Sequence, residues 1–262
     1  MGTSKGYDMP SGGDWTPLKT DATSFVKNEG RGSVSPGKLL ADYLRANGGA
    51  RAIASGSGSR DSGTGASGGG KAGGRGGGGG RTAGSAARNL GGFLSSVGAV
   101  GLDQALRDAG LVDLIGKPAK EVVSGLLDTL AEPGSTLDEH AARLALAKLN
   151  DDLLKGAETY EDVERALSQA LDQRGLDHIL ASFFGHYLYE RFCRDFYENW
   201  VKRVGSTQAA RSLKSIKDYI ESRIKAKLAG RDVAKVKWHT REGLRLAQQV
   251  LQDTLEVFEV IA

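Results

Sequence analysis

The sequence is poor in several residue types, and each shortage excludes a class of protein. It has one cysteine, Cys193, among 262 residues, so no intramolecular disulfide can form. No apolar run approaches the roughly 18 residues that a membrane helix needs, and the N-terminus lacks the apolar stretch of a secretory signal. Aromatic residues make up 6% and hydrophobic residues 39% of the chain. We therefore expect a soluble protein of the reducing cytoplasm, with no membrane association.

Glycine is the exception, and its distribution predicts a disordered N-terminal arm. Most of the 38 glycines fall before residue 102, where they cannot bury side-chain area and cost the most backbone entropy to order. We predict that residues 1–82 form the arm, extended over 1–34 and continued by a flexible Gly/Ser linker over 55–81. One short helix is expected near 36–46, capped by Ser35. We interpret it as a docking helix with one apolar face, formed by Leu39, Leu40, Tyr43 and Leu44.

The remainder, residues 83–262, has helical periodicity and no convincing strand. Apolar residues recur at helical spacing in about seven segments, which predicts an all-α, irregular helical bundle. Thr136 with Glu139 has the pattern of a capping box, and Thr159 is expected to cap another helix. The segment from Asp177 to about Val204 carries most of the large aromatic side chains. We place this helix at the centre of the core.

No pattern of residues predicts a catalytic, cofactor or metal site. Residues 65–72 resemble a phosphate-binding loop until the last position, where Ala72 replaces the required Ser or Thr. His178 and His186 are eight residues apart, whereas metal-binding pairs on a helix are usually three or four apart. Cys193 lies among aromatic residues and is interpreted as a buried structural cysteine. The protein is therefore predicted not to be an enzyme.

Residues 202–245 are strongly basic, with thirteen Lys and Arg against four acidic residues, a net charge of +9. One interpretation is a solvated face of an amphipathic helix. The other is a docking surface for an acidic protein or for nucleic acid. The candidate docking residues are Lys214, Lys217, Lys225, Lys227, Lys235, Lys237 and Trp238.

Gly2 is the candidate modification site. If Met1 is the initiator and is removed, Gly2 carries a free α-amine with a pKa of about 8, which is partly nucleophilic at neutral pH. The N-myristoylation motif has Ser or Thr at position six, whereas this chain has Gly6. The alternative is that a small residue at position two is simply common.

Several segments resemble the B component of the bacterial Qat antiphage defence system. They are Met1–Tyr7 with Pro10–Gly13, Leu114–Glu121 with Leu126–Asp128, and Pro133–Glu139 with Ala142–Arg143. The resemblance implies a non-enzymatic adaptor encoded beside an ATPase, a QueC-like enzyme and a TatD-like nuclease. A QueC-like enzyme activates a carboxylate with ATP and transfers it to an amine, so Gly2 becomes a hypothetical acceptor. The alternatives are a nucleic-acid-binding module that uses the basic face and a structural assembly protein.

Overall fold

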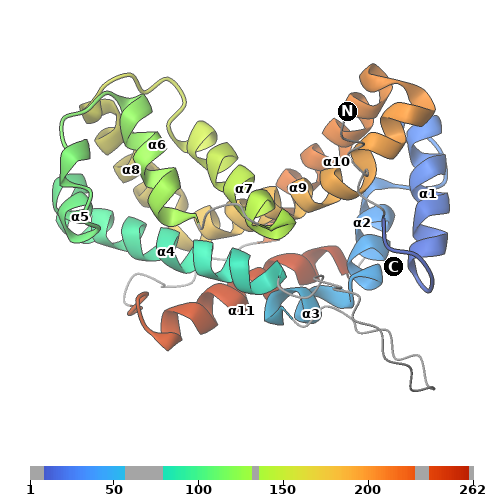
Figure 1. The fold of residues 1–262 in the computed structure, drawn as a ribbon, viewed down its shortest axis with the longest axis horizontal. Helices are drawn as coiled ribbons and strands as arrows, with labels where there is room; N and C mark the ends of the chain where they lie inside the picture. The colour runs from blue at the N-terminus through green and yellow to red at the C-terminus, as the bar shows by residue number, and fades with distance from the viewer. Residues whose placement is uncertain (1–8, 57–78, 132–135, 228–235, 260–262) are drawn as a thin grey trace, which may run out of the picture.

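The protein is built from helices that pack around one continuous apolar core (Figure 1). The computed structural model describes residues 9–56, 79–131, 136–227 and 236–259, and within these ranges it contains eleven α-helices, one 3-10 helix and no strand. In chain order they are α1 (Trp15–Lys27), α2 (Pro36–Ala46), α3 (Gly49–Ser55), α4 (Gly79–Val100), α5 (Leu102–Asp108), η1 (Val112–Leu114), α6 (Ala119–Leu130), α7 (Leu137–Leu153), α8 (Tyr160–Arg174), α9 (Leu176–Val204), α10 (Ser206–Lys227) and α11 (Arg241–Glu259). The all-α prediction is confirmed. None of these helices is both long and apolar enough to cross a membrane.

Helix α9 is the central element, as predicted. It is 29 residues long and contacts α1, α4, α7, α8, α10 and α11. Single glycines separate it from α8 and α10: Gly175 and Gly205 each have a φ of 79°, which residues other than glycine rarely adopt. In Figure 1, α9 runs from the end that holds α5, α6 and α8 to the end that holds α1, α2 and α10.

The capping box predicted at Thr136 and the cap predicted at Thr159 are both present, and Thr159 also forms a full capping box. The Thr136 hydroxyl accepts a hydrogen bond from the Glu139 amide at 3.1 Å, and the Glu139 carboxylate accepts one from the Thr136 amide at 2.8 Å. Thr159 and Asp162 form the same reciprocal pair at the start of α8. Two otherwise unpaired amides are satisfied at each helix start, which fixes where α7 and α8 begin.

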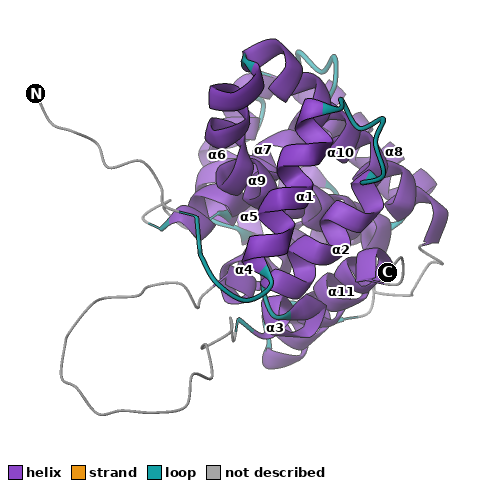
Figure 2. Ribbon diagram, turned by 90° about the vertical axis from the view of Figure 1, so that its right-hand side faces the viewer, coloured by secondary structure: helices purple, strands orange, loops and turns teal. Residues whose placement is uncertain are grey.

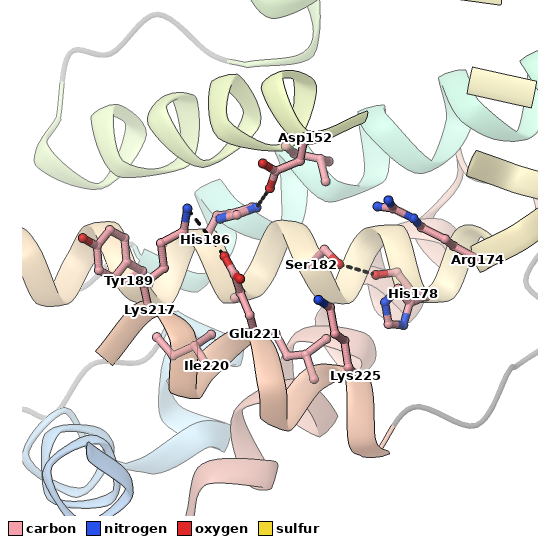
Figure 3. A pocket seen from close by; sticks show the side chains of 13 residues that line it. Asp152, Arg174, His178, Ser182, His186, Tyr189, Lys217, Ile220, Glu221 and Lys225 are labelled. Atoms are coloured by element: carbon pink, nitrogen blue, oxygen red, sulfur yellow. Dashed lines mark hydrogen bonds and ion pairs between the residues drawn. The ribbon is translucent and has the colours of Figure 1, made fainter. Parts of the chain in front are cut away.

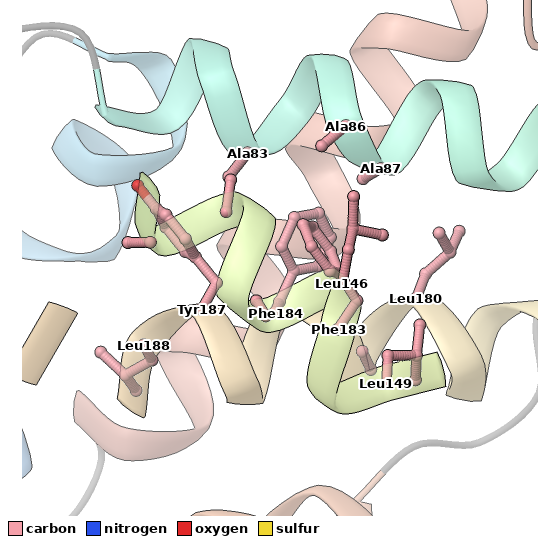
Figure 4. Close-up of a cluster of buried hydrophobic side chains, with 14 of the residues drawn as sticks. Ala83, Ala86, Ala87, Leu146, Leu149, Leu180, Phe183, Phe184, Tyr187 and Leu188 are labelled. Carbon is pink, nitrogen blue, oxygen red and sulfur yellow. The ribbon is translucent and has the colours of Figure 1, made fainter. Parts of the chain in front are cut away.

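Helix α4 brings small side chains against the aromatic part of α9. Ala83, Ala86 and Ala87 face Phe183, Phe184 and neighbouring leucines of α7 and α9 (Figure 4). An exposed helix with this many glycines would be weakly stable, because glycine costs about 1 kcal/mol per residue relative to alanine. Burial of its alanine face therefore has to stabilise α4, since local propensity does not.

The N-terminal segment differs from the predicted arm. Described residues 9–34 contain α1, which the sequence analysis treated as extended, and Leu18 and Phe25 of α1 are each 1% exposed. The predicted docking helix exists as α2, with its Ser35 cap, but its apolar face is buried against this chain's own helices. Figure 2 shows α1, α2 and α10 side by side. An isolated short amphipathic helix is marginal, and packing onto the body makes α1–α3 part of the domain. The parts of the arm at 1–8 and 57–78 lie outside the described residues.

A buried polar network ties α2 to α9. The Tyr43 hydroxyl donates a hydrogen bond to Asp195 at 2.6 Å, and Asp195 also accepts one from Arg194 at 2.7 Å. The Arg191 guanidinium donates to the Asn47 side chain at 3.2 Å. Burial raises the pKa of Tyr43 well above its usual value, so this hydroxyl remains a donor. The network fixes the orientation of α2 on the central helix.

Candidate functional site

A cavity of about 380 Å³ lies between α9 and α10 and is closed by the ends of α7 and α8 (Figure 3). We call it the α9–α10 cavity. Helix α9 lines it with one face, because residues three or four apart in a helix point the same way. Its α9 residues are His178, Ser182, Gly185, His186 and Tyr189. Lys217, Glu221 and Lys225 line it from α10, Asp152 from α7 and Arg174 from α8.

Gly185 lets the two long helices approach each other beside the cavity. A Cβ at this position would lie 2.4 Å from Cδ1 of Ile224 on α10, which is closer than real side chains come. Any larger residue would therefore force the Ile224 side chain to shift. The sequence analysis did not single out Gly185, and a lone glycine in an aromatic helix was the available signal.

His186 and Asp152 form a hydrogen-bonded pair at the cavity wall. Nε2 of His186 lies 2.9 Å from Oδ2 of Asp152, with the histidine side chain 6% exposed and the carboxylate 50% exposed. Burial lowers the pKa of His186, and the nearby Asp152 carboxylate opposes this effect. The hydrogen bond to Asp152 gives the buried His186 ring a polar partner.

The pair resembles half of a nucleophile-activating arrangement, but the nearest hydroxyl on the same face is otherwise engaged. Ser182 lies one helical turn before His186, and its hydroxyl donates a hydrogen bond to the His178 carbonyl at 3.0 Å. Within the described ranges, the hydrogen bonds and ion pairs of His186 join it to Asp152 and to no serine, threonine or cysteine. The geometry therefore provides a positioned histidine without an aligned nucleophile.

The other end of the cavity is positively charged. Arg174 ends α8 and Lys225 lies in the last turn of α10, and both are exposed. Among the described residues, neither side chain forms an ion pair with a carboxylate. His178 lies between them in Figure 3. Burial chiefly lowers the pKa of His178, Asp177 raises it, and the charges of Arg174 and Lys225 lower it further.

The predicted basic surface divides between the cavity and the outer face of α10. Lys217 and Lys225 line the cavity, whereas Lys214 is exposed and pairs with Asp218 at 2.5 Å. Lys217 pairs with Glu221 at 3.5 Å. Lys237 is exposed at the start of the last described range. Lys235 lies outside the described residues, as does the side chain of Lys227.

Trp238 was predicted as part of the docking surface, and the structure corrects this. Its side chain is 2% exposed. A Cβ on Gly91 would lie 2.7 Å from the Trp238 ring, so the indole packs directly on the glycine backbone of α4. A large aromatic side chain gains more from this burial than from remaining beside solvated lysines. Trp238 therefore holds the segment before α11 against α4, and it also lines a second cavity of about 740 Å³.

Gly2, the hypothetical acceptor, lies outside the described residues. Met9 is the first described residue, and its side chain packs against the core. The described residues contain no group of three or more His, Cys, Asp or Glu side chains placed to hold a metal ion.

Comparison with known proteins places the chain in a defence family. Residues 68–258 match the family model described as Qat anti-phage system associated protein QatB. This span covers nearly three quarters of the chain, so the protein belongs to the QatB family and is a component of a Qat antiphage system. The resemblance inferred from the sequence is confirmed. No curated protein matches the chain, and no solved structure does.

Proposed function

We propose that the protein acts as a non-enzymatic adaptor of its Qat system. Its membership of the QatB family, shown by the match over residues 68–258, is the observation that carries the proposal. The arrangement of α1–α3 supports it, because these helices extend the packed body on the N-terminal side of the matched span. The proposed partners are a QueC-like enzyme, an ATPase and a TatD-like nuclease.

The finer part of the proposal is that the α-amine of Gly2 is acylated by the QueC-like partner. ATP activates a carboxylate of the donor, the amine nitrogen attacks the activated carbonyl, and an amide forms while the phosphate-bearing group and one proton leave. Met9 packs against the body, so Gly2 stays within about 25 Å of that point whatever the conformation between them. A partner must therefore present its active site within this distance of Met9.

Intact-mass and peptide mass spectrometry of the protein purified from cells that express the complete operon tests this assignment. We expect a mass increase confined to the N-terminal peptide, lost when the QueC-like gene is deleted. Gly2→Pro, which replaces the primary amine, is expected to abolish both the added mass and protection against phage, whereas Gly6→Pro retains both. An unmodified Gly2 in a complex that still protects cells would contradict the acylation, although not the adaptor role.

A nucleic-acid-binding module is the second candidate, supported by the basic composition of α10. This helix carries six Lys or Arg residues and two acidic residues. Its ion pairs weaken the case, because Asp218 and Glu221 already neutralise Lys214 and Lys217. Binding through phosphate contacts would fall steeply with salt. Retention on DNA that drops with salt and is abolished by Lys214→Gln with Lys225→Gln would favour this function over the adaptor.

A further inference from the structure

The α9–α10 cavity has the charge pattern of a ligand site and goes beyond the proposed adaptor role. Its volume of about 380 Å³ is at the lower end of the roughly 300–1,000 Å³ typical of small-molecule sites. Arg174 and Lys225 lie at one end, while Leu149, Ile220 and Ile224 supply apolar walls. Most of the lining residues are polar or charged, and convergent polar groups orient a small ligand.

At the cationic end, Asp177 acts on His178, but neither Arg174 nor Lys225 pairs with a carboxylate among the described residues. Arg174 and Lys225 stand in the last turns of α8 and α10, where each helix dipole supplies about half a negative charge. Both side chains therefore keep their hydrogen-bond donors available to a ligand. Lys217 differs, since Glu221 lies 3.5 Å from it. An anion at this end would relieve the repulsion between the two cations.

We propose that the α9–α10 cavity binds a small phosphorylated molecule, with its phosphate between Arg174, Lys225 and His178. Arginine presents a planar fork that matches two phosphate oxygens, and lysine adds a compact positive charge. Figure 3 shows all three side chains at the same end of the cavity. A dianionic phosphate uses this many donors better than a single carboxylate does.

The rest of the ligand would carry hydrogen-bond donors. Asp152 and Glu221 line the cavity beyond the cationic end, and each carboxylate has one described partner, His186 and Lys217 respectively. A carboxylate offers about four acceptor positions, so both retain capacity for hydroxyl or amino groups of a ligand. The apolar lining residues Leu149, Ile220 and Ile224 give a ring a surface to pack on. Together these features describe a molecule of mononucleotide size or smaller.

Calorimetric titration of the full-length protein with adenosine 5′-monophosphate, inorganic phosphate, adenosine and malonate tests the proposal. We expect adenosine monophosphate to bind more tightly than adenosine and malonate. Arg174→Gln combined with Lys225→Gln is expected to weaken its binding by at least about tenfold, since hydrogen bonds to charged groups are lost. Lys120→Gln, an exposed lysine on α6 outside the cavity lining, is the matched control and should leave affinity unchanged.

Proton NMR titration of the histidine rings gives a readout specific to this end of the cavity. A bound phosphate favours the charged imidazolium, so the pKa of His178 should rise on ligand binding despite the opposing charges of Arg174 and Lys225. Three results of the binding titrations would each overturn the proposal. The first is no binding of adenosine monophosphate or phosphate at millimolar concentration. The others are equal affinity for adenosine, and full affinity in a double variant that melts like the wild type.

Discussion

The hydrogen bond between Tyr43 and Asp195 should hold the N-terminal helices on the body. Tyr43→Phe removes one hydroxyl and keeps the ring that packs on Trp15, Phe192 and Phe196. The lost bond is short, 2.6 Å, and its acceptor is a carboxylate that is 1% exposed. A hydrogen bond to a charged group contributes about 1.5–3 kcal/mol, so we expect a loss of that size in the free energy of unfolding.

Asp195→Ala should destabilise the same network more than Tyr43→Phe does. It removes the acceptor of the buried Tyr43 hydroxyl and the two hydrogen bonds that Arg194 donates to Asp195. Removing one partner of a buried charged pair costs about 3–5 kcal/mol, which sets the expected loss. In the double variant the two effects should fall short of their sum, because both remove the same bond.

Urea unfolding followed by tryptophan fluorescence and circular dichroism measures these values. Coincident transitions for the two signals would show that α1–α3 unfold together with the body. Tyr197→Phe is the matched control, since it removes the same hydroxyl from an exposed position of α9 and should change stability by less than about 0.5 kcal/mol. A Tyr43→Phe loss no larger than that of Tyr197→Phe would refute the anchoring role of this bond.

Three further predictions concern the core and its titratable groups. Gly91→Ala should lower the free energy of unfolding by about 1–3 kcal/mol, because its Cβ would clash with the Trp238 ring. Gly116→Ala is the control in the same urea assay: the space around Gly116 is open but its φ is 73°, so this variant measures backbone strain without a clash. The folded-state pKa of His186 is lowered, so its stabilising neutral form is fully present above the unfolded value of about 6.5 and stability should fall as pH drops below it. Unfolding curves over this pH range should lose that slope in His186→Gln, and a slope that persists contradicts the assignment. Cys193 is half-buried, not fully buried as the sequence suggested, and this partial burial raises its pKa to about 12. Iodoacetamide should therefore label it slowly in the native protein and rapidly in urea, as mass spectrometry can follow, and rapid native labelling would contradict the raised pKa.

The helical segments could be predicted from the sequence because caps and apolar periodicity are local signals. The capping box at Thr136 depends on residues three apart and forms as predicted, and Thr159 caps α8 as expected. The aromatic content of residues 177–204 likewise identified α9 as central. Helix α1 was missed, although Trp15, Leu18, Ala22 and Phe25 recur at helical spacing. Its polar composition and the nearby glycines outweighed that period.

The sequence by itself determined the all-α class, the caps and the family, because each depends on residues close together in the chain or on a recognisable string of them. Tertiary structure alone decided that the predicted arm contributes α1–α3 to the core and that Trp238 is buried on Gly91. It also brought Asp152, Arg174 and Lys225 from three helices to one cavity. Such contacts depend on how helices cross, which follows from the packing of whole side-chain surfaces and not from any local pattern.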